Sequence, residues 1–212
     1  MDQRLTALAI MQDAPVIPVI VLNNVAHAVP MAQALVAGGI RVLEVTLRTP
    51  EGLASIEAIA RAVPEAIVGA GTVRSAADAR AAASAGARFA VSPGYTGALG
   101  QACQALQLPL LPGVATSGEI MAAQDDGFNE LKFFPAVQAG GSAMLKAWQG
   151  PFGDVRFCPT GGVSPANAHE FLALKNVVCV GGSWLVPTDA LEQGDWKRIT
   201  ALAGAAKSLR SA

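Results

Sequence analysis

A chain of 212 residues with 52% apolar and 15% charged side chains has enough apolar material for a buried core, which excludes a disordered chain. Fifteen basic and sixteen acidic residues give a net charge of −1 without any basic tract, which excludes nucleic acid as a partner. The longest apolar run, residues 15–22, is too short to cross a membrane, and three cysteines without CxxC spacing predict reduced thiols in a cytoplasmic protein.

Short apolar runs alternate with alanine-rich amphipathic stretches along the whole chain. The apolar runs predict strands at residues 16–22, 41–47, 66–70, 88–92, 108–112, 130–134, 155–158 and 177–180. Helices are expected near residues 25–37, 51–62, 75–85, 96–106, 117–126, 141–149, 165–174 and 189–209. Eight strand–helix repeats predict an α/β fold, a (β/α)8 TIM barrel, with residues 1–212 as one domain. A doubly wound open sheet is the alternative, which eight repeats rather than five or six disfavour.

Capping residues support several of the helix boundaries. Ser75 is an expected N-cap, and Ser164 is another because Pro165 follows it at the first helical position. Gly38 and Gly86 are placed where glycine ends a helix.

The second predicted strand carries two charged residues on one face. Side chains alternate between faces, so Leu43 and its neighbours at every second position form an apolar face that packs under helices. Glu44 and Arg48 then point into the barrel, where charges are unfavourable unless they are paired or functional. A structural ion pair between them is the alternative, but about 13 Å of strand separates them at roughly 3.3 Å per residue. We therefore expect separate tasks for the two residues.

The ends of the third and fourth strands carry residues suited to a binding site. The sequence Gly-Ala-Gly-Thr at 69–72 places Thr72 at the barrel mouth, close to the second strand and Arg48. A guanidinium at the mouth offers two parallel donors to a substrate carboxylate. Pro93 follows the fourth strand, and we expect a rigid turn there that lines the rim.

Lys132 is the one lysine of five that falls inside a predicted strand. It shares a face with Glu130 and Phe134, and this face points into the barrel. A lysine kept from water is more readily uncharged, and an uncharged amine attacks carbonyl carbons. The alternative is a lysine whose amine reaches solvent from the strand end.

The barrel geometry brings the charged residues of these two strands together. Strands two and six lie opposite each other in an eight-stranded barrel, and alternate strands contribute to the same interior layer. Glu44 and Lys132 are therefore expected to face one another. An amine beside a carboxylate has the groups needed for Schiff-base chemistry, because carbinolamine dehydration and enamine protonation both require proton transfer.

Paired glycines follow the seventh and eighth strands and predict a phosphate site. Gly161 and Gly162 follow one strand, and Gly181 and Gly182 end the other. Glycine lets the backbone approach a ligand closely, and barrels of this type often bind phosphate at these two loops. A tight turn would explain each pair separately. The hydroxyls of Thr160 and Ser183 are candidate donors in the same place.

Motifs for metals and dinucleotides are absent from the sequence. Its two histidines stand alone on predicted helices, and neither HxH nor HExxH occurs, so we expect no metal site. No GxGxxG follows a strand, so we expect no dinucleotide cofactor.

These motifs together resemble those of the bacterial 2-keto-3-deoxy-6-phosphogluconate (KDPG) aldolases of the Entner–Doudoroff pathway. The resemblance extends from residue 15 to residue 192. Its most specific stretches are VLEVTLRT at 42–49, GAGTV at 69–73, KFFPA at 132–136, RFCPTGG at 156–162 and GGSWLVP at 181–187.

The resemblance implies a class I aldolase, usually a homotrimer, that uses no cofactor. Its substrate would be a small phosphorylated keto acid, cleaved to pyruvate and D-glyceraldehyde 3-phosphate, and 4-hydroxy-2-oxoglutarate would be a second substrate. Lys132 would form the Schiff base at the C2 carbonyl, and Glu44 would act as general base and acid through a water molecule. Arg48 and Thr72 would hold the pyruvyl carboxylate, and Thr160 would influence the stereochemical preference.

The resemblance also implies which positions contact the phosphate. They are Gly161, Gly162, Gly182 and Ser183. Pro93 and Phe134 are further candidates for substrate contact, because one lies on the rim and the other shares the interior face of Lys132.

Three alternatives stay open at this point. The substrate is the epimeric 6-phosphogalactonate compound in the first, and the protein is a barrel isomerase acting on a phosphosugar without a covalent step in the second. In the third, the barrel only binds phosphosugars. Reduction with borohydride in the presence of pyruvate separates the first from the other two.

Overall fold

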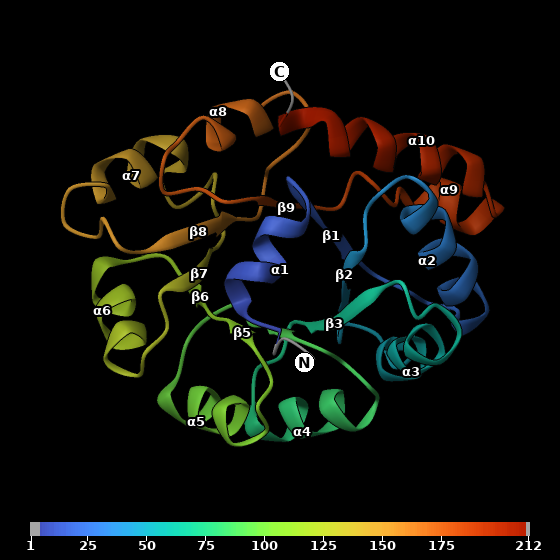
Figure 1. Cartoon of the computed structure of the whole chain (residues 1–212), viewed down its shortest axis with the longest axis horizontal. Helices are drawn as coiled ribbons and strands as arrows, with labels where there is room; N and C mark the ends of the chain where they lie inside the picture. The colour runs from blue at the N-terminus through green and yellow to red at the C-terminus, as the bar shows by residue number, and fades with distance from the viewer. Residues whose placement is uncertain (1–4, 211–212) are drawn as a thin grey trace.

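The computed structural model describes residues 5–210 and consists of parallel strands with helices outside them (Figure 1). The strands are β1 (Val16–Ile20), β2 (Val42–Thr46), β3 (Ile67–Gly71), β4 (Ala90–Val91), β5 (Leu110–Leu111), β6 (Gly113–Val114), β7 (Glu130–Phe133), β8 (Arg156–Pro159) and β9 (Val180–Gly182). Six of them pair in the order β5-β4-β3-β2-β1-β9, and three in the order β6-β7-β8. The sheet is strongly curled, as expected for an α/β fold of repeated strand–helix units.

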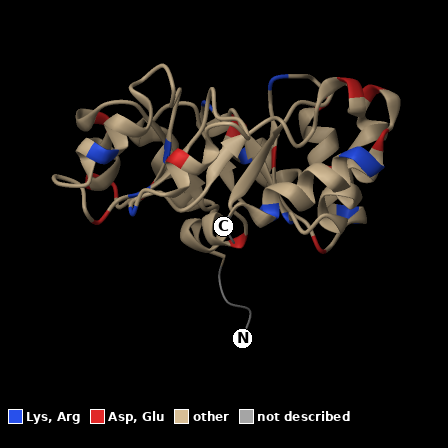
Figure 2. Cartoon of the chain, turned by 90° about the horizontal axis from the view of Figure 1, so that it is seen from above, with Lys and Arg blue, Asp and Glu red and all other residues tan. Residues whose placement is uncertain are grey.

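Most helices alternate with the strands along the chain and cover the outer face of the sheet (Figure 1). They are α1 (Ala7–Asp13), α2 (Ala28–Ala37), α3 (Gly52–Ala62), α4 (Ala76–Ser84), α5 (Gly97–Ala105), α6 (Ser117–Asp125), α7 (Gly141–Trp148), α8 (Ala168–Leu172), α9 (Thr188–Gln193) and α10 (Trp196–Lys207), with short 3-10 turns at Val25–His27 and Ser208–Arg210. Within residues 5–210 no helix has the length and apolar character to span a membrane. Charges of both signs are spread over the periphery (Figure 2).

The fifth predicted strand is interrupted, which the sequence analysis did not anticipate. β5 ends at Leu111 and β6 begins at Gly113, because Pro112 between them has no N–H to donate. The carbonyl of Pro112 accepts from the backbone N–H of Lys132 at 2.8 Å, and the Ser92 hydroxyl accepts from the Gly113 N–H at 3.3 Å. The chain thus passes from the larger sheet to the smaller one across a single residue.

Alternation along β2 separates two cores, as the sequence predicted. Leu43 and Val45 are fully buried in the large core between sheet and helices. Val42 belongs instead to a second apolar cluster on the inner face, together with Phe89 and Cys158. The inner face is therefore apolar near the start of β2, and its next residue toward the carboxyl end is Glu44.

Helix α1 fills the inner face at the amino-terminal end, and the sequence analysis did not predict this helix. Ile10 and Met11 are fully buried in the inner cluster, and α1 crosses the middle of the sheet in Figure 1. Thr6 caps the helix by accepting from the Ala9 N–H at 3.1 Å. Asp13 at its end forms an ion pair with Arg41, just before β2. α1 has only seven residues, and its first five are all apolar, so it shows no helical period and packing rather than pattern explains the helix.

The predicted helix boundaries were partly right. Ser75 caps α4 through the Asp78 N–H at 3.1 Å, and Gly38 and Gly86 lie where α2 and α4 end. The prediction that Ser164 caps a helix was wrong, because α8 begins only at Ala168.

Two side-chain contacts explain the late start of α8. The Asn167 carboxamide oxygen accepts from the Ser164 N–H at 2.8 Å, and its nitrogen donates to the Gly162 carbonyl at 3.1 Å. These contacts hold residues 162–167 in a turn. The last predicted helix is likewise divided, since Gly194 at φ +66° ends α9 before Asp195 caps α10.

Candidate active site

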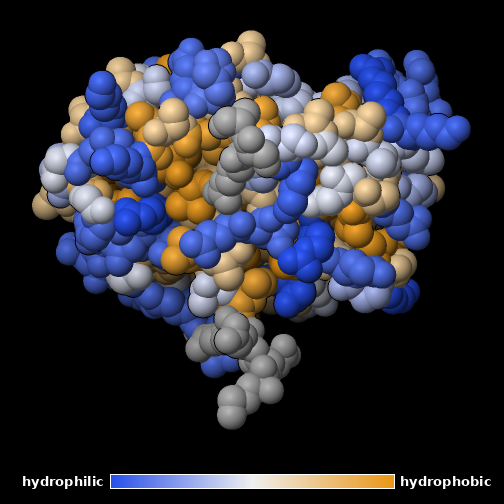
Figure 3. Space-filling model, turned by 45° about the horizontal axis from the view of Figure 1, so that its top comes forward, coloured by the Kyte–Doolittle hydropathy of each residue, from blue (hydrophilic) through white to orange (hydrophobic). Residues whose placement is uncertain are grey.

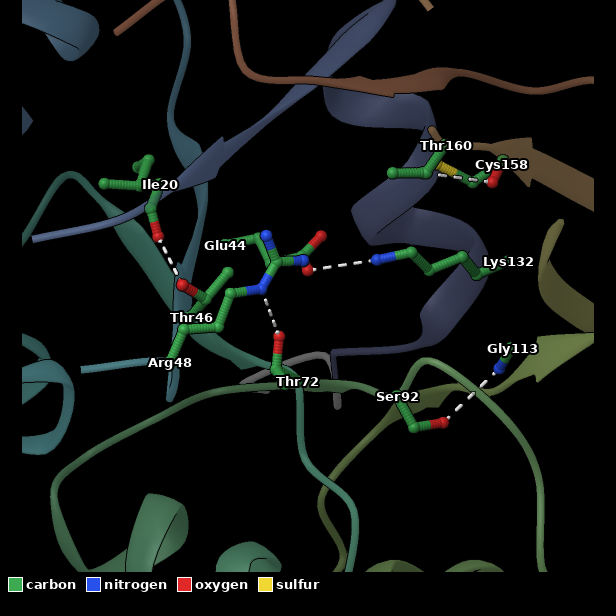
Figure 4. A network of polar contacts seen from close by, with 10 residues as sticks. All are labelled: Ile20, Glu44, Thr46, Arg48, Thr72, Ser92, Gly113, Lys132, Cys158 and Thr160. Atoms are coloured by element: carbon green, nitrogen blue, oxygen red, sulfur yellow. Dashed lines mark hydrogen bonds and ion pairs between the residues drawn. The ribbon is translucent and has the colours of Figure 1, made fainter. Parts of the chain in front are cut away.

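Lys132 on β7 and Glu44 on β2 form a buried pair on the inner face of the sheet (Figure 4). The Lys132 Nζ lies 3.2 Å from the Glu44 Oε1, and the two side chains are 4% and 3% exposed. Each residue stands between neighbours that pack in the outer core, such as Leu131 and Phe133 beside Lys132. The expectation that these two residues face one another is confirmed. Because a buried ion pair gives little net stability, its presence favours a functional role.

Small residues and one aromatic ring lie beside Lys132. In the neighbouring strands its register partners are Gly113 and Cys158, both small. The ring of Phe134 lies on the other side, with its centroid 5.3 Å from Nζ. The amine therefore lies near both the Glu44 carboxylate and the Phe134 ring, and it is close enough to Glu44 for proton transfer between them.

Arg48 and Thr72 form a second polar pair at the carboxyl end of the sheet (Figure 4). The Arg48 Nε donates to the Thr72 Oγ1 at 3.0 Å, so the predicted proximity is confirmed. Thr72 has φ +60°, a conformation that a β-branched residue rarely adopts, and its backbone is strained. In this conformation the Thr72 hydroxyl accepts from Arg48, which is exposed and is not part of any ion pair found within residues 5–210.

A cavity of about 140 Å³ lies between two glycine-containing segments, residues 160–163 and 181–183, and Arg48. The predicted residues that line it are Arg48, Phe134, Thr160, Gly161, Gly162, Gly182 and Ser183. Gly161 and Gly162 have φ values of +100° and +74°, which side-chain-bearing residues avoid. A cavity of this size, bordered by backbone and a guanidinium, suits a small anionic group.

Glycine is also required at the end of β9, because other side chains occupy the space that a Cβ would need. A Cβ at Gly181 would lie 2.1 Å from the Thr160 Oγ1, and one at Gly182 would lie 1.7 Å from the Trp184 ring. Val19 and Val163 line the cavity as well and were missed by the sequence analysis. An apolar residue in an apolar strand carries no chemical signal in the sequence. The available signal for Val19 was that it shares the inward face of β1 with Ile17, two residues earlier.

Four predicted site residues do not line this cavity: Glu44, Lys132, Thr72 and Pro93. The first three belong to the two polar pairs, and Pro93 has a different environment. Pro93 borders a separate cavity of about 180 Å³, with Arg74 and Tyr95 among the other lining residues. Its backbone does approach the strand beside Lys132, since a Cβ at Gly113 would lie 2.4 Å from the Pro93 carbonyl carbon. A substrate contact for Pro93 stays a prediction. Within the described residues, no three His, Cys, Asp or Glu side chains gather where they could hold a metal ion.

Comparison with known proteins gives a consistent result over nearly the whole chain. Residues 8–202 match the family model described as KDPG and KHG aldolase. The chain is 57% identical over 198 residues to the KHG/KDPG aldolase of Escherichia coli (strain K12), covering 93% of both proteins. It is 56% identical over 198 residues to the 2-dehydro-3-deoxy-phosphogluconate aldolase of Dickeya dadantii (strain 3937), again covering 93% of each.

A solved structure extends the comparison to three dimensions. The KDPG aldolase of Legionella pneumophila is 48% identical and superposes with a TM-score of 0.94, covering 96% of this chain and 99% of that one. In that crystal structure pyruvate was captured at low pH as a covalent carbinolamine intermediate.

Proposed function

Because the chain belongs to the KDPG and KHG aldolase family, we propose that it is a class I aldolase that reversibly cleaves 2-dehydro-3-deoxy-6-phospho-D-gluconate to pyruvate and D-glyceraldehyde 3-phosphate. The observation that carries the proposal is the buried Lys132 amine 3.2 Å from the Glu44 carboxylate. Amine and carboxylate are within the reach that proton transfer requires. The pyruvate carbinolamine of the Legionella pneumophila enzyme supports the same chemistry here.

Lys132 opens the reaction as a nucleophile. Its amine, relieved of a proton by Glu44, adds to the C2 carbonyl carbon of the substrate and forms a carbinolamine. The carbinolamine oxygen takes up a proton and leaves as water, so the nitrogen becomes a protonated Schiff base. This cation is the electron sink for the next step.

Glu44 then acts in the proton transfers that accompany carbon–carbon cleavage. It removes the proton of the C4 hydroxyl, the C3–C4 bond breaks, and its electron pair moves toward the Schiff base to give an enamine. Glyceraldehyde 3-phosphate leaves as the aldehyde. The enamine carbon takes a proton back, and addition of water releases pyruvate and the free amine of Lys132.

The remaining site residues hold the two ends of the substrate. Arg48, with Thr72 behind it, binds the pyruvyl carboxylate, because a guanidinium matches a carboxylate with two parallel donors. Gly161, Gly162, Gly182 and Ser183 bind the phosphate in the cavity of about 140 Å³. Phe134 and Pro93 border the reacting carbons, and Thr160, which is 6% exposed between the two ends, influences which C4 epimer fits.

The test is reductive trapping with pyruvate and sodium borohydride, followed by peptide mass spectrometry. The expected result is a reduced pyruvyl adduct on Lys132. An unmodified protein with intact phosphosugar binding would instead support a non-covalent isomerase or a binding protein.

The substrate range needs a second measurement, which is turnover on the two epimeric phosphorylated keto acids and on 4-hydroxy-2-oxoglutarate. We expect the gluconate compound to be preferred. The relative from Escherichia coli is named for both KHG and KDPG, which supports a second activity here.

The complete architecture is part of the proposal. We propose that the strands close into a (β/α)8 barrel of one domain, with β5 and β6 counting as one strand. Support comes from the single residue between β5 and β6, and from parallel bridges that join Phe157 to Val177 and Thr160 to Gly181.

The protein is expected to be a homotrimer in the cytoplasm. Apolar side chains on the surface favour association, such as Met121 at 58% and Val137 at 42% exposure, and Figure 3 shows apolar patches among hydrophilic groups. Both the trimer and the compartment stay predictions, and light scattering in solution tests the first.

A further inference from the structure

Gly71, the last residue of β3, stands directly beside the Glu44 side chain. A Cβ built on Gly71 would lie 2.3 Å from the Glu44 Oε1, 2.6 Å from its Cγ and 2.9 Å from its Cδ. These nearest atoms all belong to Glu44. Gly71 does not have a positive φ, so alanine can adopt the same backbone conformation. Glycine is therefore needed at residue 71 to leave space for Glu44, and not to allow a positive φ.

The preceding inward-facing residue of β3 is also a glycine that leaves space for a neighbouring side chain. Gly69, two residues earlier, would bring a Cβ within 2.4 Å of the Phe89 ring. The space above Gly69 is thus filled by an aromatic ring of the inner apolar cluster, and the space above Gly71 by a carboxylate. Register places Gly69 opposite Glu44 and Gly71 opposite Thr46 on the adjacent β2. The carboxylate of Glu44 therefore leans along β2 toward Gly71.

We propose that Gly71 is a positioning residue for the aldolase reaction: its missing side chain lets the Glu44 carboxylate occupy the place from which it exchanges protons at Lys132. The inference rests on the proposed function. It adds a residue whose effect on the reaction passes entirely through Glu44.

Alanine at residue 71 would move a catalytic group while leaving the fold in place. The atoms in its way are the outer atoms of one flexible side chain, which can rotate aside. The 3.2 Å contact between Nζ and Oε1 would then be lost. A displacement of about 1 Å in a reacting group can lower a rate by roughly 100-fold.

The experiment compares Gly71→Ala with the wild-type chain in three measurements. Exchange of the pyruvate methyl protons with deuterium, followed by NMR, reports proton transfer at the enamine. Borohydride trapping at saturating pyruvate reports Schiff-base formation on Lys132, and thermal unfolding reports stability. We expect exchange to fall by about 10- to 100-fold, the extent of trapping to be retained, and the unfolding midpoint to change little. Gly118→Ala is the matched control, because a Cβ at Gly118 meets no atom within 4 Å.

A second background makes the test specific to Glu44. In Glu44→Ala the obstructing atoms are absent, so adding Gly71→Ala should leave the remaining exchange rate unchanged. Any loss of stability seen with Gly71→Ala alone should also disappear in this background. An equal loss of exchange in both backgrounds would overturn the inference, and so would full exchange in Gly71→Ala. If the wild-type chain neither exchanges nor traps pyruvate, the proposed function itself fails, which is a different result.

Discussion

The inner face of the curled sheet differs sharply between its two ends. At the amino-terminal end, Ile10 and Met11 of α1 meet Val42 and Phe89 in an apolar cluster that is fully buried. At the carboxyl end the same face carries Glu44 with Lys132, and Arg48 with Thr72. Val42 and Glu44 are consecutive inward residues of one strand. A step of two residues along β2 thus leads from a region that stabilises the fold to the region where we propose that the reaction takes place.

This difference has a physical reason. Parallel strands all present their carboxyl ends on one side, where the following loops can vary and bring glycines and polar groups together. The amino-terminal side is closed by α1, whose buried residues contribute apolar area and no reactive groups. We therefore predict that substitutions at the carboxyl end of the strands change activity, and that substitutions at the amino-terminal end change stability.

The largest effect is expected from Lys132→Ala. Removing the nucleophile should lower cleavage by roughly 10⁴- to 10⁶-fold, the range seen when a nucleophile is removed from other covalent enzymes. Steady-state turnover checks the rate, and circular dichroism checks the fold. Lys146→Ala on the exposed surface of α7 is the control and should retain full turnover. Wild-type turnover in Lys132→Ala would remove this residue from its role.

Glu44→Gln should be the next most damaging change at the carboxyl end. The amide keeps the size of the side chain but cannot accept the proton, so methyl-proton exchange of pyruvate should slow by about 10²- to 10⁴-fold. Glu192→Gln, an exposed position on α9, controls for the loss of one negative charge. Undiminished exchange in Glu44→Gln would contradict the assignment of Glu44.

Met11→Ala addresses the amino-terminal end. Met11 is fully buried in the inner cluster, and its truncation should lower the free energy of unfolding by about 2–5 kcal/mol. The KM for substrate should stay the same, which denaturant titration and kinetics together would show. Leu106→Ala is the control, since Leu106 is 37% exposed and its truncation should change stability little. A large loss of activity in folded Met11→Ala would break the distinction between the two ends.

Arg48→Met should have the smallest effect of the four. Loss of a charge-assisted contact to the substrate carboxylate should raise KM by about 10- to 100-fold, with a smaller change in kcat. Arg88→Met places the same substitution at an exposed position just before β4, toward the other end of the strands, and should leave KM unchanged. Equal KM values for the two variants would show that Arg48 does not bind the carboxylate.

Much of this arrangement was predictable from local sequence pattern. Alternation in β2 and β7 correctly assigned Glu44 and Lys132 to the inner face, because side chains in a strand point to opposite faces in turn. The glycines after β8 and at the end of β9 line one cavity, at the end of the strands where the sequence predicted a site. The pattern failed where it was too short to show a period, as in α1, and where a single proline interrupted a strand at residue 112.

Composition, alternation and glycine spacing already specified the class of fold, the inward residues and the end of the strands at which we propose that the substrate binds. These properties depend on neighbours in the chain. The 3.2 Å contact between residues 88 positions apart, the strained backbone of Thr72 and the space that Gly71 leaves for Glu44 depended on the folded arrangement. Each of them depends on contacts between different strands, and packing of the whole sheet sets such contacts to within a fraction of an ångström.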